Sequence, residues 1–357
     1  MVKMRLKKNR RKIDEIDAKI VALLNKRAEE TMRIRTIKKK IKQDIYSPHR
    51  EKEIYKNILK KNNGPLSGKS LKAVYREIMS GSLSLEKPLG IAYLGPPLTF
   101  THLAALSNFG KSVNYIECGG IGEVFGEVDK GRADYGVVPI ENSIEGAVNY
   151  TFDMFVNSDL KICSEIYLEI SHNLLGGMGD MKKIKKVYSH PQVFAQCRKW
   201  IEKNIPRAEL IEVSSTSKAA ERSAGEKDAA CIASLMAAGS YGLKALARGI
   251  EDTAHNVTRF LVIGRDFAKP TGNDKTSIMF SIRDKVGALH DMLVPFKKNR
   301  INLTKIESRP SRLKAWEYYF FVDLEGHSSG QKVKRALTGL AKGCSYLKIL
   351  GSYPVGK

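Results

Sequence analysis

The chain has 357 residues, of which 42% are hydrophobic, and a formal net charge of +23 at pH 7. This length predicts two or three domains of about 150 residues each. No apolar run approaches the ~18 residues that a membrane span needs. No apolar segment follows the basic N-terminus, as it would in a secretory signal. The five cysteines are scattered without a C-x-x-C pair, so we expect no metal site, no disulfide framework and a reducing, cytoplasmic location.

The first segment is strongly basic, since residues 1–87 hold 25 Lys and Arg against 10 Asp and Glu. Such a segment attracts anions, either nucleic acid or small polyanionic substrates, although a solvated surface is the simpler interpretation for most of these lysines. Aromatic residues are not interleaved with the basic run, and the run carries a regular apolar stripe. We therefore expect no nucleic-acid partner and no membrane partner.

Residues 5–43 are predicted to form one long helix, because no Gly or Pro interrupts them and apolar residues recur at spacings of three and four or their sums. Pro48 marks the first turn of a second helix that ends near Lys61, and a third helix is expected over 68–85. A helix of about 38 residues is ~57 Å long. The two shorter helices cannot cover it, so we expect an intertwined homodimer or a higher homo-oligomer.

The long predicted helix places its cations at different heights. Arg27 and Lys38 share one face about 16 Å apart, because eleven residues make close to three turns. Arg10 lies about 25 Å before Arg27 and about 100° round the helix. It cannot reach the same small ligand within one chain, but in a dimer it can reach the site of the partner subunit.

Three motifs in this order, RRKIDEIDAKIVALLNKR, IYSPHRE and REIMSGSLSLEKP, resemble the all-helical chorismate mutases over residues 5–87. Ser47 stands where the family often has Asp, and Glu86 stands where some members have Gln. The implied reaction is a Claisen rearrangement, which needs no nucleophile and no cofactor, only a compact substrate and stabilisation of the charge that develops on the breaking ether oxygen. A domain retained only as a dimerisation scaffold is the alternative.

The resemblance also implies residue roles. Lys38 and Glu86 donate hydrogen bonds to the ether oxygen. The remaining substrate-binding residues hold the two carboxylates of chorismate or line the site: Arg10 (from the partner chain), Arg27, Arg50, Glu51 and Ser82.

From residue 88 to 268, predicted strands alternate with helices, which is typical of an α/β domain. The strands are expected at LGIAYLG, YGVVPIE, KICSEIYLEI, KKVYSH, AACIAS and TRFLVIG. Polar clusters follow several of these strands, at turns and at the starts of helices. Helix N-termini bind anions, so several of them converging on one cleft would suit a dicarboxylate. For Ser215 and Thr216 the simplest interpretation is that they cap the N-terminus of a helix. Glu141 could instead be a helix or turn cap, and His190 could instead have a structural role. The candidate substrate-binding residues of these clusters are Thr99, Asn142, Ser143, Ser189, Gln192, Ser215 and Thr216.

The ordered strings VPIENS, SHPQ and TRF resemble prephenate dehydratase along residues 89–267. The resemblance implies a two-lobed α/β domain like that of periplasmic binding proteins, and a reaction that removes water and carbon dioxide from prephenate to give phenylpyruvate. Leu98 stands where the family pattern GPxGTF usually has Gly. A dehydratase that prefers arogenate is the alternative within this family.

The stretch NVTRF carries the implied catalytic centre. Thr258 is expected beside the departing hydroxyl of prephenate. Arg259 is expected near a carboxylate of the substrate or buttressing the site, and Phe260 at the start of the buried strand. Arg259 and Phe260 are both counted as substrate-binding residues. Threonine is a weak general acid, so we expect Thr258 to orient and hydrogen-bond the leaving group. Glu141 is the candidate proton source if its environment raises its pKa.

Residues 275–357 are predicted to run β-α-β-β-α-β, the order of a ferredoxin-like α+β sandwich. The strings GALHDML and KIESRP resemble the ACT regulatory domain that binds phenylalanine in such dehydratases. A turn glycine is the alternative for Gly287. The implied effector-binding residues are Gly287, Ala288, Leu289, Asn302, Glu307 and Ser308.

Together the segments resemble the bifunctional chorismate mutase–prephenate dehydratases of phenylalanine biosynthesis. The expected domains are 1–87 for the mutase, 88–268 for the dehydratase and 275–357 for the ACT domain. Chorismate and prephenate are the implied substrates, phenylalanine is the implied feedback inhibitor, and no cofactor is implied.

Overall fold

The structure is a computed structural model that describes residues 1–357 except 41–45, 86–88, 178–179, 283–284, 312–316 and 357. The chain divides into two compact units, one made of Met1–Leu89 with Phe109–Asn114 and the other of Gly90–Asn108 with Tyr115–Lys357. No helix within the described residues is both long and apolar enough to cross a bilayer.

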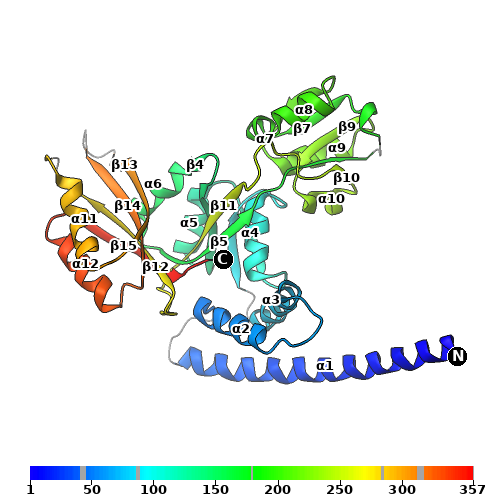
Figure 1. The fold of residues 1–357 in the computed structure, drawn as a ribbon, viewed down its shortest axis with the longest axis horizontal. Coiled ribbons are helices and arrows are strands. Elements are labelled where there is room, and N and C mark those ends of the chain that lie inside the picture. Colours follow the sequence, from blue (N-terminus) through cyan, green and yellow to red (C-terminus); the bar gives the residue numbers. More distant parts are fainter. Residues whose placement is uncertain (41–45, 86–88, 178–179, 283–284, 312–316, 357) are drawn as a thin grey trace. The chain divides into compact units, whose positions relative to one another are not determined.

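The first unit contains the helices α1 (Val2–Lys40), α2 (Pro48–Lys60) and α3 (Gly68–Ser84), as the sequence predicts. Pro48 occupies the first turn of α2, where its missing N–H costs nothing, and the Ser67 side chain caps α3 by accepting from the Ser70 N–H at 3.0 Å. The predicted end of the first helix, residues 41–43, lies outside the described residues. The N-terminal half of α1 extends well past α2 and α3 (Figure 1).

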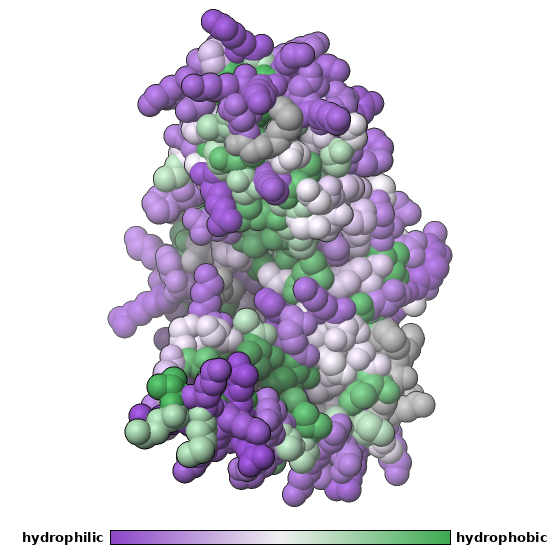
Figure 2. Space-filling model, turned by 90° about the vertical axis from the view of Figure 1, so that its right-hand side faces the viewer, coloured by the Kyte–Doolittle hydropathy of each residue, from purple (hydrophilic) through white to green (hydrophobic). Residues whose placement is uncertain are grey.

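The apolar stripe of α1 is exposed in the single chain. At the lower end of Figure 2, where the N-terminal helices are found, hydrophobic residues lie at the surface among hydrophilic ones. A stripe of this kind normally packs against another element. Its members are between 37% and 66% exposed: Ile13, Ile16, Ile20, Leu23, Leu24 and Ile37.

The second unit begins with a lobe built on a mixed sheet of order β2-β1-β3-β11-β5, with β4 paired to β3. β1 runs parallel to β3, and β11 runs antiparallel to both β3 and β5. Its strands are β1 (Gly90–Leu94), β2 (Asn114–Cys118), β3 (Tyr135–Asn142), β4 (Gly146–Ala147), β5 (Lys161–Glu169) and β11 (Val257–Gly264). Its helices are α4 (Phe100–Phe109), α5 (Ile121–Asp129) and α6 (Asn149–Asn157).

A second lobe is inserted between β5 and β11, around a sheet of order β10-β6-β9-β7-β8. The chain enters it after β5 and leaves it before β11, which are neighbours in the first sheet. Its strands are β6 (Asn173–Gly176), β7 (Lys186–Ser189), β8 (Glu209–Glu212), β9 (Ala229–Ala233) and β10 (Lys244–Ala247). Its helices are η1 (Met181–Lys183), α7 (Pro191–Gln196), α8 (Arg198–Asn204), α9 (Thr216–Ala224) and α10 (Leu235–Tyr241).

The C-terminal part has the predicted β-α-β-β-α-β order, with a sheet of order β13-β14-β12-β15. One face packs on its two helices through residues such as Ile278 and Val322. The other face shares a core with the first lobe, where Phe321 and Tyr353 join Ile162. The elements are β12 (Asp274–Ser281), α11 (Ala288–Lys298), β13 (Leu303–Pro310), β14 (Tyr318–Glu325), α12 (Gln331–Ala341) and β15 (Tyr346–Pro354).

The two-lobed α/β domain and the α+β sandwich are thus as expected. Strands predicted from continuous apolar runs are confirmed as β1, β3, β5, β7, β9 and β11. Four further strands were not predicted: β2, β6, β8 and β10. These are short, and β2, β8 and β10 are at sheet edges, where the period-two and apolar-run signals are weakest.

Candidate active sites

A pocket of about 300 Å³ lies in the first unit between α1, α2 and α3. Arg27, Lys38, Arg50, Glu51 and Ser82 all line it, so the structure brings these predicted site residues together. The Arg27 Nη1 donates to the Ser82 Oγ at 2.7 Å, and the Lys38 Nζ donates to the Ser47 Oγ at 3.2 Å. Three cations around one cavity are suited to a ligand that carries two carboxylates.

The electrostatics of this pocket favour an anion further. Burial raises the pKa of Glu51 to about 8, although a hydrogen bond with Tyr46 acts to lower it. The carboxyl group is therefore neutral at pH 7 and does not repel a dianion. Burial also lowers the pKa of Arg27, whose guanidinium nevertheless stays charged at any physiological pH.

The other predicted mutase residues lie elsewhere or cannot be placed. Arg10 is exposed on the N-terminal half of α1, more than four turns before Arg27, and does not line the pocket of its own chain. Glu86 lies outside the described residues.

In the second unit, the end of β3 and the start of β11 bring Asn142 and Thr258 together. They are directly opposite each other in the ladder, and the Asn142 Nδ2 donates to the Thr258 Oγ1 at 2.8 Å. The Asn142 Oδ1 accepts from the N–H groups of Ile144 and Glu145, which fixes the orientation of its amide. No acceptor among the described residues takes the Thr258 hydroxyl proton, so the hydroxyl can donate to a ligand.

A chain of neutral side chains continues from this pair to the second lobe. Asn142 donates to the Asn256 Oδ1 at 2.6 Å, and Asn256 donates to the Gln196 Oε1 at 3.2 Å. The Gln196 Oε1 also lies 2.6 Å from the His172 Nε2. The Nε2 of Gln196 donates to the Glu145 carboxylate at 2.5 Å. Gln196 in α7 thereby connects the two lobes beside the Asn142–Thr258 pair.

Three residues of this chain of contacts were not predicted from the sequence: Gln196, His172 and Asn256. A signal existed for Gln196, because it lies four residues after Gln192, which in a helix such as α7 is one turn further along the same face. Asn256 precedes Thr258 in NVTRF but was not assigned a role. His172 carried no sequence signal, since its contact with Gln196 depends on tertiary structure.

Neither Arg259 nor Phe260 is placed for direct contact with a substrate, and for Arg259 the structure agrees with the buttressing alternative. Arg259 is 4% exposed, and its guanidinium contacts Glu141, Glu165 and Asp323 on the side of the sheet that packs against the C-terminal part. Adjacent strand residues point to opposite faces, so Arg259 points away from Thr258. Phe260 is 1% exposed and belongs to the core.

Glu141 does not have the raised pKa on which its candidacy as proton source depended. Burial alone would raise the pKa of Glu141, but hydrogen bonds from Lys305 and Arg259 outweigh burial, and the pKa is lowered. The environment that its candidacy required is therefore absent, and the carboxylate is ionised at neutral pH.

The hydroxyl candidates around the second lobe are mostly structural. Ser189 is fully buried and donates to the Ile232 carbonyl at 2.9 Å, so its predicted substrate contact is wrong. Ser215 caps α9 by accepting from the Lys218 N–H, as the capping alternative states, and Thr216 beside it is buried. His190 likewise caps α7 by accepting from the Gln192 N–H.

The remaining candidates lie near the turns predicted for them. Thr99 donates to the Pro96 carbonyl at 2.9 Å, and Ser143 donates to the His255 carbonyl at 3.2 Å, so both hydroxyls hold their loops. Gln192 is exposed in the first turn of α7. Leu98 has a φ of 70°, the left-handed conformation that favours glycine, so the turn keeps this conformation although glycine is replaced.

The predicted effector residues lie on α11 and around β13. Gly287 precedes α11 with a φ of 77°, Ala288 is buried and Leu289 is exposed. Asn302 donates to the Glu325 carboxylate at 3.1 Å. Glu307 and Ser308 lie on β13, where Ser308 is exposed.

Three family models match the chain: chorismate mutase type II over residues 9–87, prephenate dehydratase over 91–268 and the ACT domain over 276–342. A bifunctional chorismate mutase/prephenate dehydratase of Aquifex aeolicus is 52% identical over 353 residues, which cover 98% of this chain and 98% of the relative. A protein of the same name from Stutzerimonas stutzeri is 46% identical over 355 residues, covering 98% of this chain and 97% of the relative.

Among solved structures, the crystal structure of prephenate dehydratase in complex with L-Phe from Arthrobacter aurescens is similar with a TM-score of 0.69 and 33% identity. The similarity covers 75% of this chain and 90% of that one. The family matches follow the same order as the helical unit, the two-lobed domain and the α+β sandwich described above. The chain is therefore an enzyme with chorismate mutase, prephenate dehydratase and ACT domains, and it belongs to the family of bifunctional chorismate mutase/prephenate dehydratases.

Proposed function

We propose that residues 1–87 rearrange chorismate to prephenate, that residues 88–268 convert prephenate to phenylpyruvate, and that residues 275–357 bind phenylalanine and inhibit the second reaction. These boundaries are supported by the ranges over which the family models match. The free thiols of the described cysteines, most of them buried, agree with a cytoplasmic enzyme.

In the mutase site, Arg27 and Arg50 bind the two carboxylates of chorismate together with Arg10 of the partner subunit. Lys38 and the protonated form of Glu86 donate to the ether oxygen, on which negative charge develops as the bond breaks. The single observation that supports these roles is the pocket of about 300 Å³ that Arg27, Lys38 and Arg50 line together. Because no covalent intermediate is needed, a pocket that compresses and orients the substrate is sufficient.

The exposed apolar stripe of α1 supports a homodimer. In such a dimer the N-terminal half of one α1 packs across the partner subunit, which covers the stripe and carries Arg10 to a second pocket. The same contact therefore stabilises the dimer and completes the mutase site.

In the dehydratase site, Thr258 hydrogen-bonds the ring hydroxyl of prephenate as it leaves. The electrons of the bond between the ring and its carboxylate enter the ring, carbon dioxide and water depart, and the departing hydroxyl takes up one proton. The ring becomes aromatic, so the reaction has a large driving force and modest polarisation of the leaving group suffices. This role is supported by the hydrogen bond that the Asn142 Nδ2 donates to the Thr258 Oγ1. Because the Thr258 oxygen accepts this bond, the hydroxyl proton of Thr258 is available to the substrate.

Substitution of Thr258 tests the proposal. Thr258→Ala is expected to lower dehydratase kcat by about 100-fold or more, as loss of a transition-state donor typically does, with KM changed by less than about threefold. Thr258→Ser should recover part of the rate. Thr151, which donates to the Pro139 carbonyl in the same lobe, supplies the control: Thr151→Ala should lower stability without a selective loss of kcat. Equal losses in Thr258→Ala and Thr258→Ser would instead indicate a packing role.

Phenylalanine binding is tested by calorimetry and by thermal unfolding. A ligand that binds the native state raises the melting temperature, and inhibition requires unequal affinity for two conformations. We expect both effects at millimolar phenylalanine, and we expect dehydratase activity to survive deletion of the effector residues without inhibition. A full-length protein that shows neither binding nor inhibition would contradict the effector role.

A further inference from the structure

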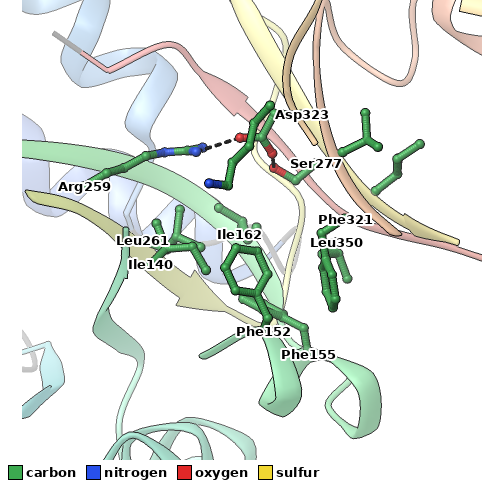
Figure 3. A pocket seen from close by; sticks show the side chains of 13 residues that line it. Ile140, Phe152, Phe155, Ile162, Arg259, Leu261, Ser277, Phe321, Asp323 and Leu350 are labelled. Atoms are coloured by element: carbon green, nitrogen blue, oxygen red, sulfur yellow. Dashed lines mark hydrogen bonds and ion pairs between the residues drawn. The ribbon is translucent and has the colours of Figure 1, made fainter. Parts of the chain in front are cut away.

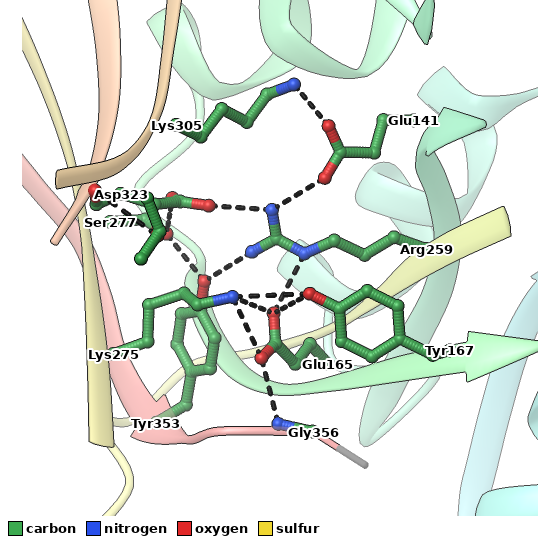
Figure 4. A network of polar contacts seen from close by, with 11 residues as sticks. Glu141, Glu165, Tyr167, Arg259, Lys275, Ser277, Lys305, Asp323, Tyr353 and Gly356 are labelled. Atoms are coloured by element: carbon green, nitrogen blue, oxygen red, sulfur yellow. Dashed lines mark hydrogen bonds and ion pairs between the residues drawn. The ribbon is translucent and has the colours of Figure 1, made fainter. Parts of the chain in front are cut away.

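A buried ion network joins the dehydratase sheet to the ACT sheet, and neither proposed site uses it directly. Arg259 stands at its centre (Figure 4). Its Nε contacts Glu165 at 2.8 Å, its Nη1 contacts Asp323 at 2.6 Å and Glu141 at 3.0 Å, and its Nη2 donates to the Tyr353 hydroxyl at 2.9 Å. Glu141 and Glu165 belong to the dehydratase sheet, whereas Asp323 and Tyr353 belong to the ACT sheet.

Lys305 extends this network to β13. Its Nζ donates to one oxygen of Glu141, while Arg259 occupies the other. Glu141 is therefore shared between a cation of its own sheet and a cation of the ACT sheet. Lys305 lies two residues before Glu307, one of the proposed effector residues, and its side chain faces the same side of β13.

The strands carry this contact to the catalytic pair. Glu141 precedes Asn142 on β3, and Arg259 follows Thr258 on β11. The ladder pairs Arg259 with Glu141 and Thr258 with Asn142, so the interface pair and the catalytic pair are adjacent rungs of one ladder. A shift of the interface rung therefore moves the catalytic rung, because the backbone between them has no intervening residue.

There is also local space for such a shift. A small cavity of about 20 Å³, room for one water molecule, lies between the sheets and is lined by Arg259, Lys305 and Asp323 on its polar side. Phe152, Phe155 and Phe321 form much of its apolar wall (Figure 3).

We propose that Arg259, Glu141 and Lys305 form a coupling triad through which phenylalanine bound at the ACT domain displaces the Asn142–Thr258 pair. This inference rests on the proposed function of Thr258 and of the effector residues. Arg259 is in this account a positioning residue, which acts on the reaction through Thr258 and does not touch the substrate. Phenylalanine inhibits because the effector-bound arrangement of β13 moves Lys305 relative to Glu141, and coupling of this kind is reciprocal.

Lys305→Met is the first test, measured in the full-length enzyme with prephenate as substrate and phenylalanine as inhibitor. The half-inhibitory concentration of phenylalanine is expected to rise at least tenfold, while phenylalanine binding measured by calorimetry changes by less than about threefold. Lys348→Met is the matched control, because Lys348 also crosses this interface from the ACT sheet but donates to the carbonyls of Phe155 and Ser158, away from β3 and β11. It should shift inhibition by less than twofold.

Arg259→Lys and Arg259→Met test the positioning role. Loss of the guanidinium should lower kcat and leave KM close to that of the wild type, and lysine should recover part of the rate. Glu141→Gln, which keeps the side-chain shape, provides the same measurement if Arg259→Met fails to fold.

Two results would overturn the inference. The first is a Lys305→Met enzyme whose half-inhibitory concentration of phenylalanine equals that of Lys348→Met and of the wild type. The second is an Arg259→Lys or Glu141→Gln enzyme with raised KM and unchanged kcat, which would indicate direct substrate contact. A wild-type enzyme that dehydrates prephenate but does not respond to phenylalanine would instead contradict the effector assignment itself, and the coupling with it.

Discussion

In the mutase pocket, Arg27 lines a cavity of about 300 Å³ and its Nη1 contacts a neutral hydroxyl, whereas Arg259 in the second unit is 4% exposed and contacts Glu141, Glu165 and Asp323. An arginine whose donors face a cavity can bind a dicarboxylate. An arginine already surrounded by carboxylates cannot, because a ligand would have to displace them. Both residues lie in motifs typical of their enzymes, so the surroundings of the side chain decide its role.

The two sites also differ in how they treat charge. The mutase pocket gathers cations and keeps Glu51 neutral, while the dehydratase residues around Thr258 are mostly neutral amides and hydroxyls. The first site is therefore suited to stabilise charge that develops in a rearranging dianion. The second is suited to orient one leaving group in a reaction that aromatisation already drives.

The largest expected effect comes from removing a pocket cation. Arg27→Ala should lower mutase kcat/KM by between about 30-fold and several thousand-fold, since loss of a desolvated charge partner typically costs about 2–5 kcal/mol. Arg33, an exposed cation of the same helix paired with Glu30, is the control, and Arg33→Ala should change mutase activity by less than about twofold. Dehydratase activity on added prephenate should be unaffected in both. Comparable mutase losses in the two variants would show that the pocket does not act through Arg27.

A smaller effect is expected from the neutral network. Asn142→Ala removes the donor that orients Thr258 and should lower dehydratase kcat by about tenfold to 100-fold, because an unsatisfied or misdirected buried hydrogen bond costs about 1–3 kcal/mol. The Thr258→Ala and Asn142→Ala effects should be far from additive, since the asparagine acts through the threonine. Additive losses in the double variant would indicate that Asn142 contacts the substrate independently.

The pH dependence of the mutase sharpens the electrostatic side of the comparison. The pKa of Glu51 is raised to about 8, so the group is neutral below that pH and ionised above it. Ionisation puts a negative charge into the pocket, and KM for chorismate should rise roughly fivefold as pH passes through 8, for an added repulsion of about 1 kcal/mol. Glu51→Gln should abolish this rise. A wild-type KM that is flat from pH 6 to 9 would contradict the neutral state.

The smallest effect is expected at Leu98. Its left-handed backbone is strained by about 1–2 kcal/mol relative to glycine, but its side chain packs against the core of the second lobe and glycine makes the unfolded chain more flexible. Because these contributions oppose each other, Leu98→Gly should change the free energy of unfolding by less than about 1 kcal/mol. Leu98→Ala, which loses packing and keeps the strain, should be clearly less stable than Leu98→Gly in urea unfolding.

Much of the fold was predictable because its signals are local. The apolar stripe of α1, the position of Pro48 and the β-α-β-β-α-β order all follow from periodicity and turn residues. Thr258 and Asn142 were predicted as site residues from their motifs, and the structure brings the two side chains together. The contacts of Arg259 were not predicted, although strand alternation already places it on the face opposite to Thr258. What covers that face, the ACT sheet, follows only from tertiary packing.

The same limit explains the other differences. Ser189 follows an apolar strand like a site residue, but β9 lies beside β7 and buries its hydroxyl. The spacing from Gln192 pointed to Gln196, but its contact with His172 joins two segments of the chain that meet only in the folded structure, so no local pattern indicates that contact. The low pKa of Glu141 depends on Lys305, a residue of another domain.

The central claim is that one chain holds two independent sites, with Arg27 in one and Thr258 in the other. Its most direct test is to incubate chorismate with the Arg27→Ala variant, with the Thr258→Ala variant and with an equal mixture of both, and to follow prephenate and phenylpyruvate. Arg27→Ala should leave chorismate unchanged, Thr258→Ala should accumulate prephenate, and the mixture should form phenylpyruvate. A folded single variant that loses both reactions, or a mixture that forms no phenylpyruvate, would contradict the account.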